Sequence, residues 1–164
     1  MEVEAYHQDR DRASHSYDGP TQRNRVMFGP PGNLYVYFIY GIHFCMNVVS
    51  EPESLGAAVL IRALEPVTGI DTMRRLRGER VPDRNLSNGP ARCCQALAVN
   101  REQDGTCLQG PDLYLEQGSP CPPDQVVAAT RIGITKSVEL PWRFLIKDNP
   151  HVSRKTATAV KRRG

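Results

Sequence analysis

The clearest hydrophobic pattern in the chain is an alternation with a period of two on either side of Gly41. Residues 34–38 place leucine, valine and phenylalanine at even positions and tyrosines at odd positions. Residues 42–48 again have apolar even positions, while their odd positions carry histidine, cysteine and asparagine. A period of two is typical of β-strands, and a glycine between two such segments marks a turn. The pattern therefore predicts a β-hairpin that turns at Tyr40 and Gly41.

The length of the hairpin loop decides which side chains share a face. Tyr37 and Asn47 lie on the same face only if the loop holds an odd number of residues, and we favour the odd loop. One face then packs into the core, the other presents Tyr35, Tyr37, His43 and Asn47, and Tyr40 protrudes at the turn. Alternating tyrosines are also common as half-buried walls of a sheet, which is the interpretation we favour for Tyr35. This stretch alone leaves a ligand-binding role and a structural role open for the others.

Other short patterns predict further strands. The segment "EVEAY" alternates, and four more segments are compact apolar runs or short alternating stretches. The predicted strands lie at residues 2–6, 57–66, 112–115, 127–134 and 142–147. The run at 57–66 ends at a proline and carries Arg62 inward or at its end.

Two helices are predicted between these strands, within residues 68–78 and 87–99. The second has Ser87 or Asn88 as a candidate N-cap and Pro90 near its first turn. Strands before and after the two helices, with short connections, indicate a mixed α+β fold rich in antiparallel strands.

Composition narrows the class of protein. The 164 residues suit one domain, and 40% hydrophobic with 24% charged residues is typical of a globular protein. No apolar run approaches the roughly 20 residues of a membrane span, and the N-terminus shows no secretory signal, so we expect a cytoplasmic chain without a membrane partner. The five cysteines form no CxxC and the four histidines show no ligand spacing. We therefore expect reduced cysteines, no metal site and no cofactor.

The basic residues are unusual, because seventeen of the twenty-one are arginine and the four lysines all lie at or after Lys136. The guanidinium group of arginine can donate two hydrogen bonds to one phosphate, so arginine is a favoured residue for binding phosphate. Residues 154–164 carry five basic side chains and no acid. This basic C-terminal tail, which we count from residue 151, is either a nucleic-acid contact or a solvated end.

The candidate chemistry centres on Glu4, which has Tyr6 on the same strand face and His15 nearby in sequence. A carboxylate, an arginine such as Arg62, a histidine and several aromatic rings suit a site that sandwiches a planar ring and activates water. The alternative is that Glu4 is an exposed acid at the edge of a sheet.

Four segments together resemble the alkyladenine (3-methyladenine) DNA glycosylase family, in order and spacing. They are "VEAYHQDRDRASHS", "QRNRVMFGPPGNLYVYFIYGIHFCMN", "VLIRALEP" and "NLSNGPARCCQALAVN". A weaker resemblance in "VVAATRIGI" and "WRFLIKDNPHVS" extends it over nearly the whole chain. The resemblance implies a single glycosylase domain over residues 1–164, built on a curved, roll-like antiparallel sheet with a protruding hairpin and flanking helices. It also implies base-excision repair of alkylated or deaminated purines (3-methyladenine, ethenoadenine, hypoxanthine), which are flipped from duplex DNA and hydrolysed from the sugar.

The same resemblance assigns roles residue by residue. Glu4 would be the general base on the attacking water, which Arg62 helps to hold. The substrate pocket would comprise Tyr6, Ala13, His15, Tyr37 and Asn47, with Asn47 at the edge of the base. Tyr40 would fill the hole in the duplex, and the other DNA contacts would come from Gly41, Ser87, Asn88, Gly89 and Arg92.

The position of the lysines bears on the reaction, because glycosylases that also cut the strand use an amine to form a Schiff base. No lysine lies in a pocket motif, so we expect base excision without strand cleavage; the Met1 amine, close to Glu4, is the one other amine to consider. From the resemblance we expect the chain to lack the helix and strand that precede the position of Glu4 in relatives. It also has His43 where an aromatic is common and Arg92 where lysine is common.

The expected partner is damaged double-stranded DNA, bound by a monomer, in the bacterial cytoplasm (nucleoid) or the eukaryotic nucleus. Two other functions fit the same residues. A truncated, catalytically inactive module would bind damaged DNA without releasing a base. A nucleoside hydrolase would act on free nucleosides and would not need Tyr40 or the basic tail.

Overall fold

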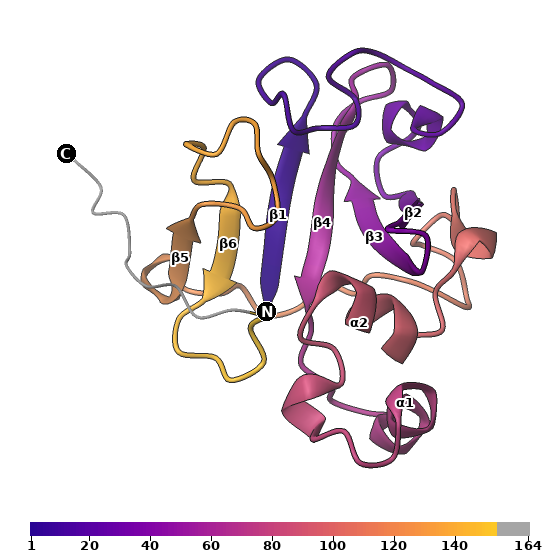
Figure 1. The fold of residues 1–164 in the computed structure, drawn as a ribbon, viewed down its shortest axis with the longest axis vertical. Coiled ribbons are helices and arrows are strands. Elements are labelled where there is room, and N and C mark those ends of the chain that lie inside the picture. Colours follow the sequence, from indigo (N-terminus) through magenta and orange to yellow (C-terminus); the bar gives the residue numbers. More distant parts are fainter. Residues whose placement is uncertain (154–164) are drawn as a thin grey trace.

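The computed structural model describes residues 1–153, which form one α+β domain on a six-stranded sheet (Figure 1). All strand pairs are antiparallel, and the strand order is β2-β3-β4-β1-β6-β5. The strands are β1 (Glu2–His7), β2 (Leu34–Ile39), β3 (His43–Val49), β4 (Ala57–Ala63), β5 (Val126–Ala129) and β6 (Arg143–Ile146). The fold class predicted from the sequence is thus confirmed. The tail at residues 154–164 lies outside the described part of the chain.

The helices are short, and the two α-helices lie beside the β3–β4 side of the sheet. The α-helices are α1 (Ile70–Arg77) and α2 (Pro90–Ala96), and the 3-10 helices are η1 (Arg25–Phe28), η2 (Asp83–Asn85), η3 (Arg101–Gln103) and η4 (Pro123–Gln125). Helix α2 packs on β3 and β4, and α1 packs on α2 (Figure 1). None of the helices within residues 1–153 is long and apolar enough to cross a membrane.

The β2–β3 hairpin has the register that the odd loop requires. Ile39 pairs with His43, which leaves three loop residues, and Tyr35 pairs with Asn47. Tyr40 and Gly41 have φ angles of 54° and 70°, in the left-handed region that a tight turn needs. The prediction that Tyr37 and Asn47 share a face is therefore confirmed, and Tyr40 protrudes with 79% of its surface exposed.

Both faces of the hairpin contribute to the core, and the odd face, with Tyr35, Tyr37, His43 and Asn47, also lines a cavity. The even face packs Leu34, Val36 and Met46 against α2 and the following loop. On the odd face, Tyr35 is buried with Met27 of η1, because residues 8–33 fold back over this end of the sheet. Only the part of the odd face nearer the turn remains open.

The start of α2 differs from the predicted cap. Gly89 is the N-cap, and no side chain bonds to the first turn. The hydroxyl of Ser87 instead donates to the Leu64 carbonyl (2.9 Å), and the amide of Asn88 donates to Asn85 Oδ1 (2.9 Å). Both candidate N-caps therefore hydrogen-bond to residues that precede the helix, and neither caps the first turn of α2.

Two predicted strands were wrong in whole or in part. Residues 112–115 form no strand, and only Tyr114 makes an isolated bridge, to Gln109. The strand predicted at 127–134 ends at Ala129. It stops there because Arg131 turns inward to a buried acid and Gly133 adopts a φ of 78°.

Candidate active site

A cavity of about 510 Å³ opens on the odd face of the hairpin. Its walls come from β1, the loop after β1, β2, β3, β4, the start of α2 and residues 132–136. Most of the residues predicted for the site line it, namely Tyr6, Ala13, His15, Tyr37, Tyr40, Asn47 and Arg62. The fold therefore brings together in space a set that the sequence spreads over 57 positions, from Tyr6 to Arg62.

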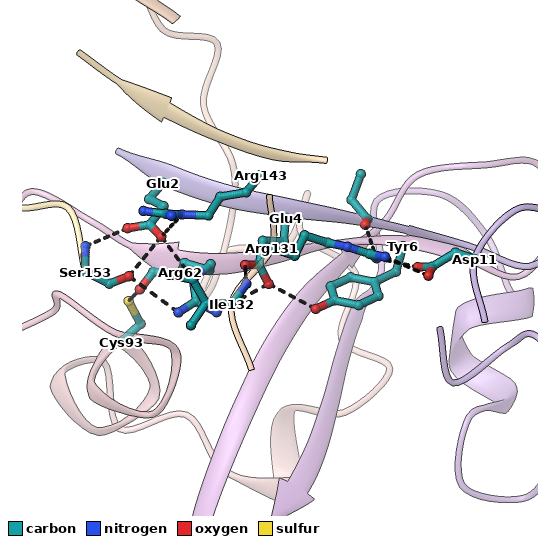
Figure 2. Close-up of polar contacts among 11 residues, drawn as sticks. Glu2, Glu4, Tyr6, Asp11, Arg62, Cys93, Arg131, Ile132, Arg143 and Ser153 are labelled. Atoms are coloured by element: carbon teal, nitrogen blue, oxygen red, sulfur yellow. Dashed lines mark hydrogen bonds and ion pairs between the residues drawn. The ribbon is translucent and has the colours of Figure 1, made fainter. Parts of the chain in front are cut away.

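Glu4 is a buried acid in an interior strand, which rules out the exposed edge acid considered above. Strand β1 lies between β4 and β6, and Glu4 is 0% exposed. Its Oε2 accepts hydrogen bonds from the Tyr6 hydroxyl (2.9 Å) and from Arg62 Nη1 (3.3 Å), and its Oε1 accepts one from the Ile132 amide (2.8 Å) (Figure 2). These three donor residues all line the cavity. The carboxylate thus lies directly behind the cavity wall.

Tyr6 is held between the acid and a second ion pair. Burial and the neighbouring Glu4 raise the pKa of Tyr6. The phenol therefore keeps its proton and donates a hydrogen bond to the carboxylate. The Arg131 guanidinium lies 4.5 Å from the centre of the Tyr6 ring. Arg131 is itself paired with Asp11, and both side chains are 0% exposed (Figure 2). This arrangement fixes the Tyr6 ring in the wall of the cavity.

Replacing Asp11 with Asn should lower the free energy of unfolding by about 3 to 5 kcal/mol, because it leaves the Arg131 charge buried without its partner. Urea denaturation measures this loss. Asp83→Asn is the matched control, since the Arg74–Asp83 pair is largely exposed and should contribute about 1 kcal/mol or less. Equal losses in the two variants would show that the buried pair has no special role.

The far wall consists of aromatic rings that meet edge to face. The His15 and Tyr37 rings lie 4.6 Å apart at 79°, while Tyr35 stacks on Tyr37 at 5.6 Å and 29°. The Tyr35 hydroxyl lies 3.0 Å from His15 Nδ1. Burial, which removes water from the ring, and the positive charge of Arg23 lower the pKa of His15. His15 is therefore neutral at neutral pH.

Asn47 and Ala13 complete the wall. Asn47 is 4% exposed, and its amide donates to the Tyr35 carbonyl (3.1 Å), which fixes the carboxamide in place. The Ala13 amide donates to Asp11 Oδ1 (2.9 Å), so the loop that carries His15 is tied to the Asp11–Arg131 pair.

The residues predicted to contact DNA have different environments. Tyr40 lies at the rim of the cavity, next to Gly41 in the hairpin loop. Arg92 is exposed and donates to Asn88 Oδ1 (2.6 Å), whereas Ser87 is 1% exposed. At the N-terminus of α2, the residues that line the cavity are Pro90 and Ala91.

Several residues of the site were missed by sequence reasoning. Lys136 lines the cavity, which corrects the expectation that the pocket holds no lysine. Arg131 and Ile132 gave no signal, because they follow a strand whose end was misplaced. The alternation of "EVEAY" places Glu2 on one face with Glu4 and Tyr6, although no role in the site was expected for it. The other amine considered above, that of Met1, donates to the Ala63 carbonyl (3.0 Å).

Residues 1–153 contain no group of three or more histidine, cysteine or acidic side chains that could hold a metal ion. The chemistry available in the described site includes that of a carboxylate, an arginine, a phenol, a neutral imidazole, a backbone amide and the Lys136 amine.

A buried carboxylate behind a cavity of aromatic rings, with an exposed aromatic at its rim, is typical of enzymes that act on a nucleobase taken out of its stack. Residues 1–150 match the methylpurine-DNA glycosylase family, and the chain belongs to that family. It is therefore a DNA glycosylase, an enzyme of DNA repair, as the sequence resemblance indicated.

Similar proteins cover most of the chain. A protein of Carboxydothermus hydrogenoformans is 50% identical over 156 residues, which are 94% of this chain and 81% of the relative. One of Rhizobium meliloti is 52% identical over 155 residues (94% and 80%), and one of Chlorobaculum parvum is 45% identical over 163 residues (99% and 78%). Each carries the name "Putative 3-methyladenine DNA glycosylase".

Proposed function

We propose that this protein flips alkylated or deaminated purines, such as 3-methyladenine, ethenoadenine and hypoxanthine, out of duplex DNA and hydrolyses their N-glycosidic bond without cutting the strand. It acts as a monomer on damaged double-stranded DNA. The observation that carries the proposal is the buried Glu4 carboxylate, whose three donors all line the aromatic cavity. The names of the relatives point to the same class of substrate.

Glu4 is the general base of the proposed reaction. An ionised carboxylate offers about four lone-pair sites, and three are taken by Tyr6, Arg62 and the Ile132 amide. The remaining site can accept the proton of a water molecule. As the bond from C1′ to the purine nitrogen breaks, the water oxygen bonds to C1′, its proton passes to Glu4, and the purine leaves with the bond electrons.

Arg62 has two parts in this step. Its Nη1 donates to Glu4 Oε2 (3.3 Å), so it holds the carboxylate in one orientation. Because Arg62 also lines the cavity, it can donate to the attacking water and keep it near C1′.

The aromatic walls favour a flipped purine. Unstacking a base costs a few kcal/mol, and stacking on an aromatic side chain returns about 1 to 3 kcal/mol per base. His15 and Tyr37 are nearly perpendicular, so a purine that stacks on one meets the other edge-on. A neutral His15 adds no positive charge to the cavity, which suits purines made cationic by alkylation.

Asn47 is proposed to exclude guanine. Guanine differs from adenine at the minor-groove edge by an exocyclic amino group, and a carboxamide fixed by the Tyr35 carbonyl leaves no room for it. Asn47→Ser should therefore increase release of guanine and alkylguanines relative to ethenoadenine, with DNA affinity largely kept. Single-turnover excision on matched duplexes gives the ratio. An unchanged ratio would mean that Asn47 serves only to hold Tyr35.

The proposed function is tested on a duplex that contains one ethenoadenine or one hypoxanthine. We expect a strand break at the lesion only after alkali. A break without alkali would implicate an amine such as Lys136 and contradict simple hydrolysis. Binding without any break would identify an inactive damaged-DNA binding module, and hydrolysis of free nucleosides at a similar rate would identify a nucleoside hydrolase.

A further inference from the structure

A second buried carboxylate lies on the same face of β1 as Glu4. Glu2 is 1% exposed and accepts four hydrogen bonds from within residues 1–153. Two come from Arg62 Nε (3.0 Å) and Arg143 Nε (2.8 Å), and two come from the amide (2.5 Å) and the hydroxyl (2.8 Å) of Ser153 (Figure 2). Although burial alone would raise it, the hydrogen bonds from Ser153 and the charges of Arg143 and Arg62 lower the pKa of Glu2. Glu2 is therefore an anion in the folded protein.

Arg62 is shared between the two carboxylates. Its Nε donates to Glu2, its Nη1 to Glu4, and its Nη2 to the hydroxyl of Ser153 (3.4 Å). A guanidinium is planar with donors in a fixed fork, so any two of these contacts determine the direction of the third. The contacts with Glu2 and Ser153 thus determine where Nη1 points.

We propose that Glu2 and Ser153 are positioning residues for base excision, because they hold Arg62 in the orientation in which its Nη1 meets Glu4. This inference rests on the proposed role of Glu4. Neither residue lines the cavity, so both act through Arg62 and not by contact with the base.

The charges around the cluster explain why its second acid is needed. Without Glu2, the Nε groups of the buried Arg62 and Arg143 would both lose their carboxylate partner. Arg62 would then reorient toward the acceptors that remain to it, Glu4 and Ser153. Asp11 is itself paired with Arg131, so it offers no substitute.

Glu2→Gln keeps the shape of the side chain but removes its charge. Because a misplacement of about 1 Å can cost about 100-fold in rate, we expect the single-turnover excision rate to fall by about 10- to 100-fold. The dissociation constant for damaged duplex should stay within about 3-fold, since the residue is buried and does not line the cavity. Ser153→Ala, which keeps the backbone donor, should lower the rate less, and Ser153→Thr should restore it.

A double-mutant cycle separates positioning from a merely structural role. A lysine at position 62 cannot bridge both acids and Ser153. In the Arg62→Lys background, Glu2→Gln should therefore lower the single-turnover excision rate by less than about a further 2-fold. Three results would overturn the proposal: an unchanged rate in Glu2→Gln, parallel losses of rate and affinity, or the same factor in both backgrounds. If Glu2→Gln does not fold, an unchanged rate in Ser153→Ala overturns it. Loss of excision in Glu4→Gln alone, with Glu2→Gln fully active, would leave the proposed function standing and reject only this inference.

Discussion

Glu4→Gln is expected to lower the rate of base excision by about 100- to 10,000-fold, the range for loss of a general base, while damaged duplex still binds. The glutamine oxygen can accept the bond from the Ile132 amide, so the shape of the wall is preserved. The amide cannot accept a proton from water, so the chemical step fails. Single-turnover excision at saturating enzyme measures the rate, and fluorescence anisotropy measures binding.

The control for this variant is Glu116→Gln, which removes an exposed carboxylate outside the cavity. It should excise at the wild-type rate. Thermal unfolding is measured for both variants, because Arg62 loses one charged partner in Glu4→Gln. Near-wild-type excision by folded Glu4→Gln would exclude Glu4 as the base.

Tyr40→Ser is expected to weaken binding to damaged duplex by about 1 to 3 kcal/mol, the contribution of one stacked aromatic. The side chain is 79% exposed at the hairpin tip, so its removal leaves the core unchanged. Serine tolerates the positive φ of this position about as well as tyrosine, whereas glycine would also change the flexibility of the turn.

Comparing a paired lesion with a lesion in single-stranded DNA tests the role of Tyr40. If it fills the space left by the flipped base, its loss should affect a paired lesion much more than a lesion in single-stranded DNA. Tyr114→Ser is the matched control, since Tyr114 is 54% exposed and does not line the cavity. Equal losses on paired and single-stranded substrates would contradict the wedge role.

The sequence was sufficient for those parts of the site that lie on regular strands. Alternation assigned the faces of β2 and β3, and an odd loop brought Tyr37 and Asn47 together as observed. The proline-terminated apolar run located β4 and its inward arginine, Arg62. Such patterns succeed because a strand has only two faces, and burial selects one of them.

The parts that could not be predicted depend on contacts between distant segments. Arg131 pairs with Asp11 across 120 positions of sequence, and no local pattern reports such a partner. The same inward turn ended β5 at Ala129 and brought Lys136 to the cavity. Residues 112–115 have the composition of a strand but no neighbouring strand to pair with beyond one isolated bridge.

The most direct test of the proposed activity is mass-spectrometric detection of free base. Wild-type protein is incubated in excess with a duplex bearing one ethenoadenine, and the same reaction is run with Glu4→Gln. We predict that the wild type releases one ethenoadenine per duplex and leaves the strand intact until alkali is added, while Glu4→Gln releases almost none. A wild-type protein that binds the duplex without releasing the base, or a Glu4→Gln variant that releases it equally fast, would contradict hydrolysis by a water activated at Glu4.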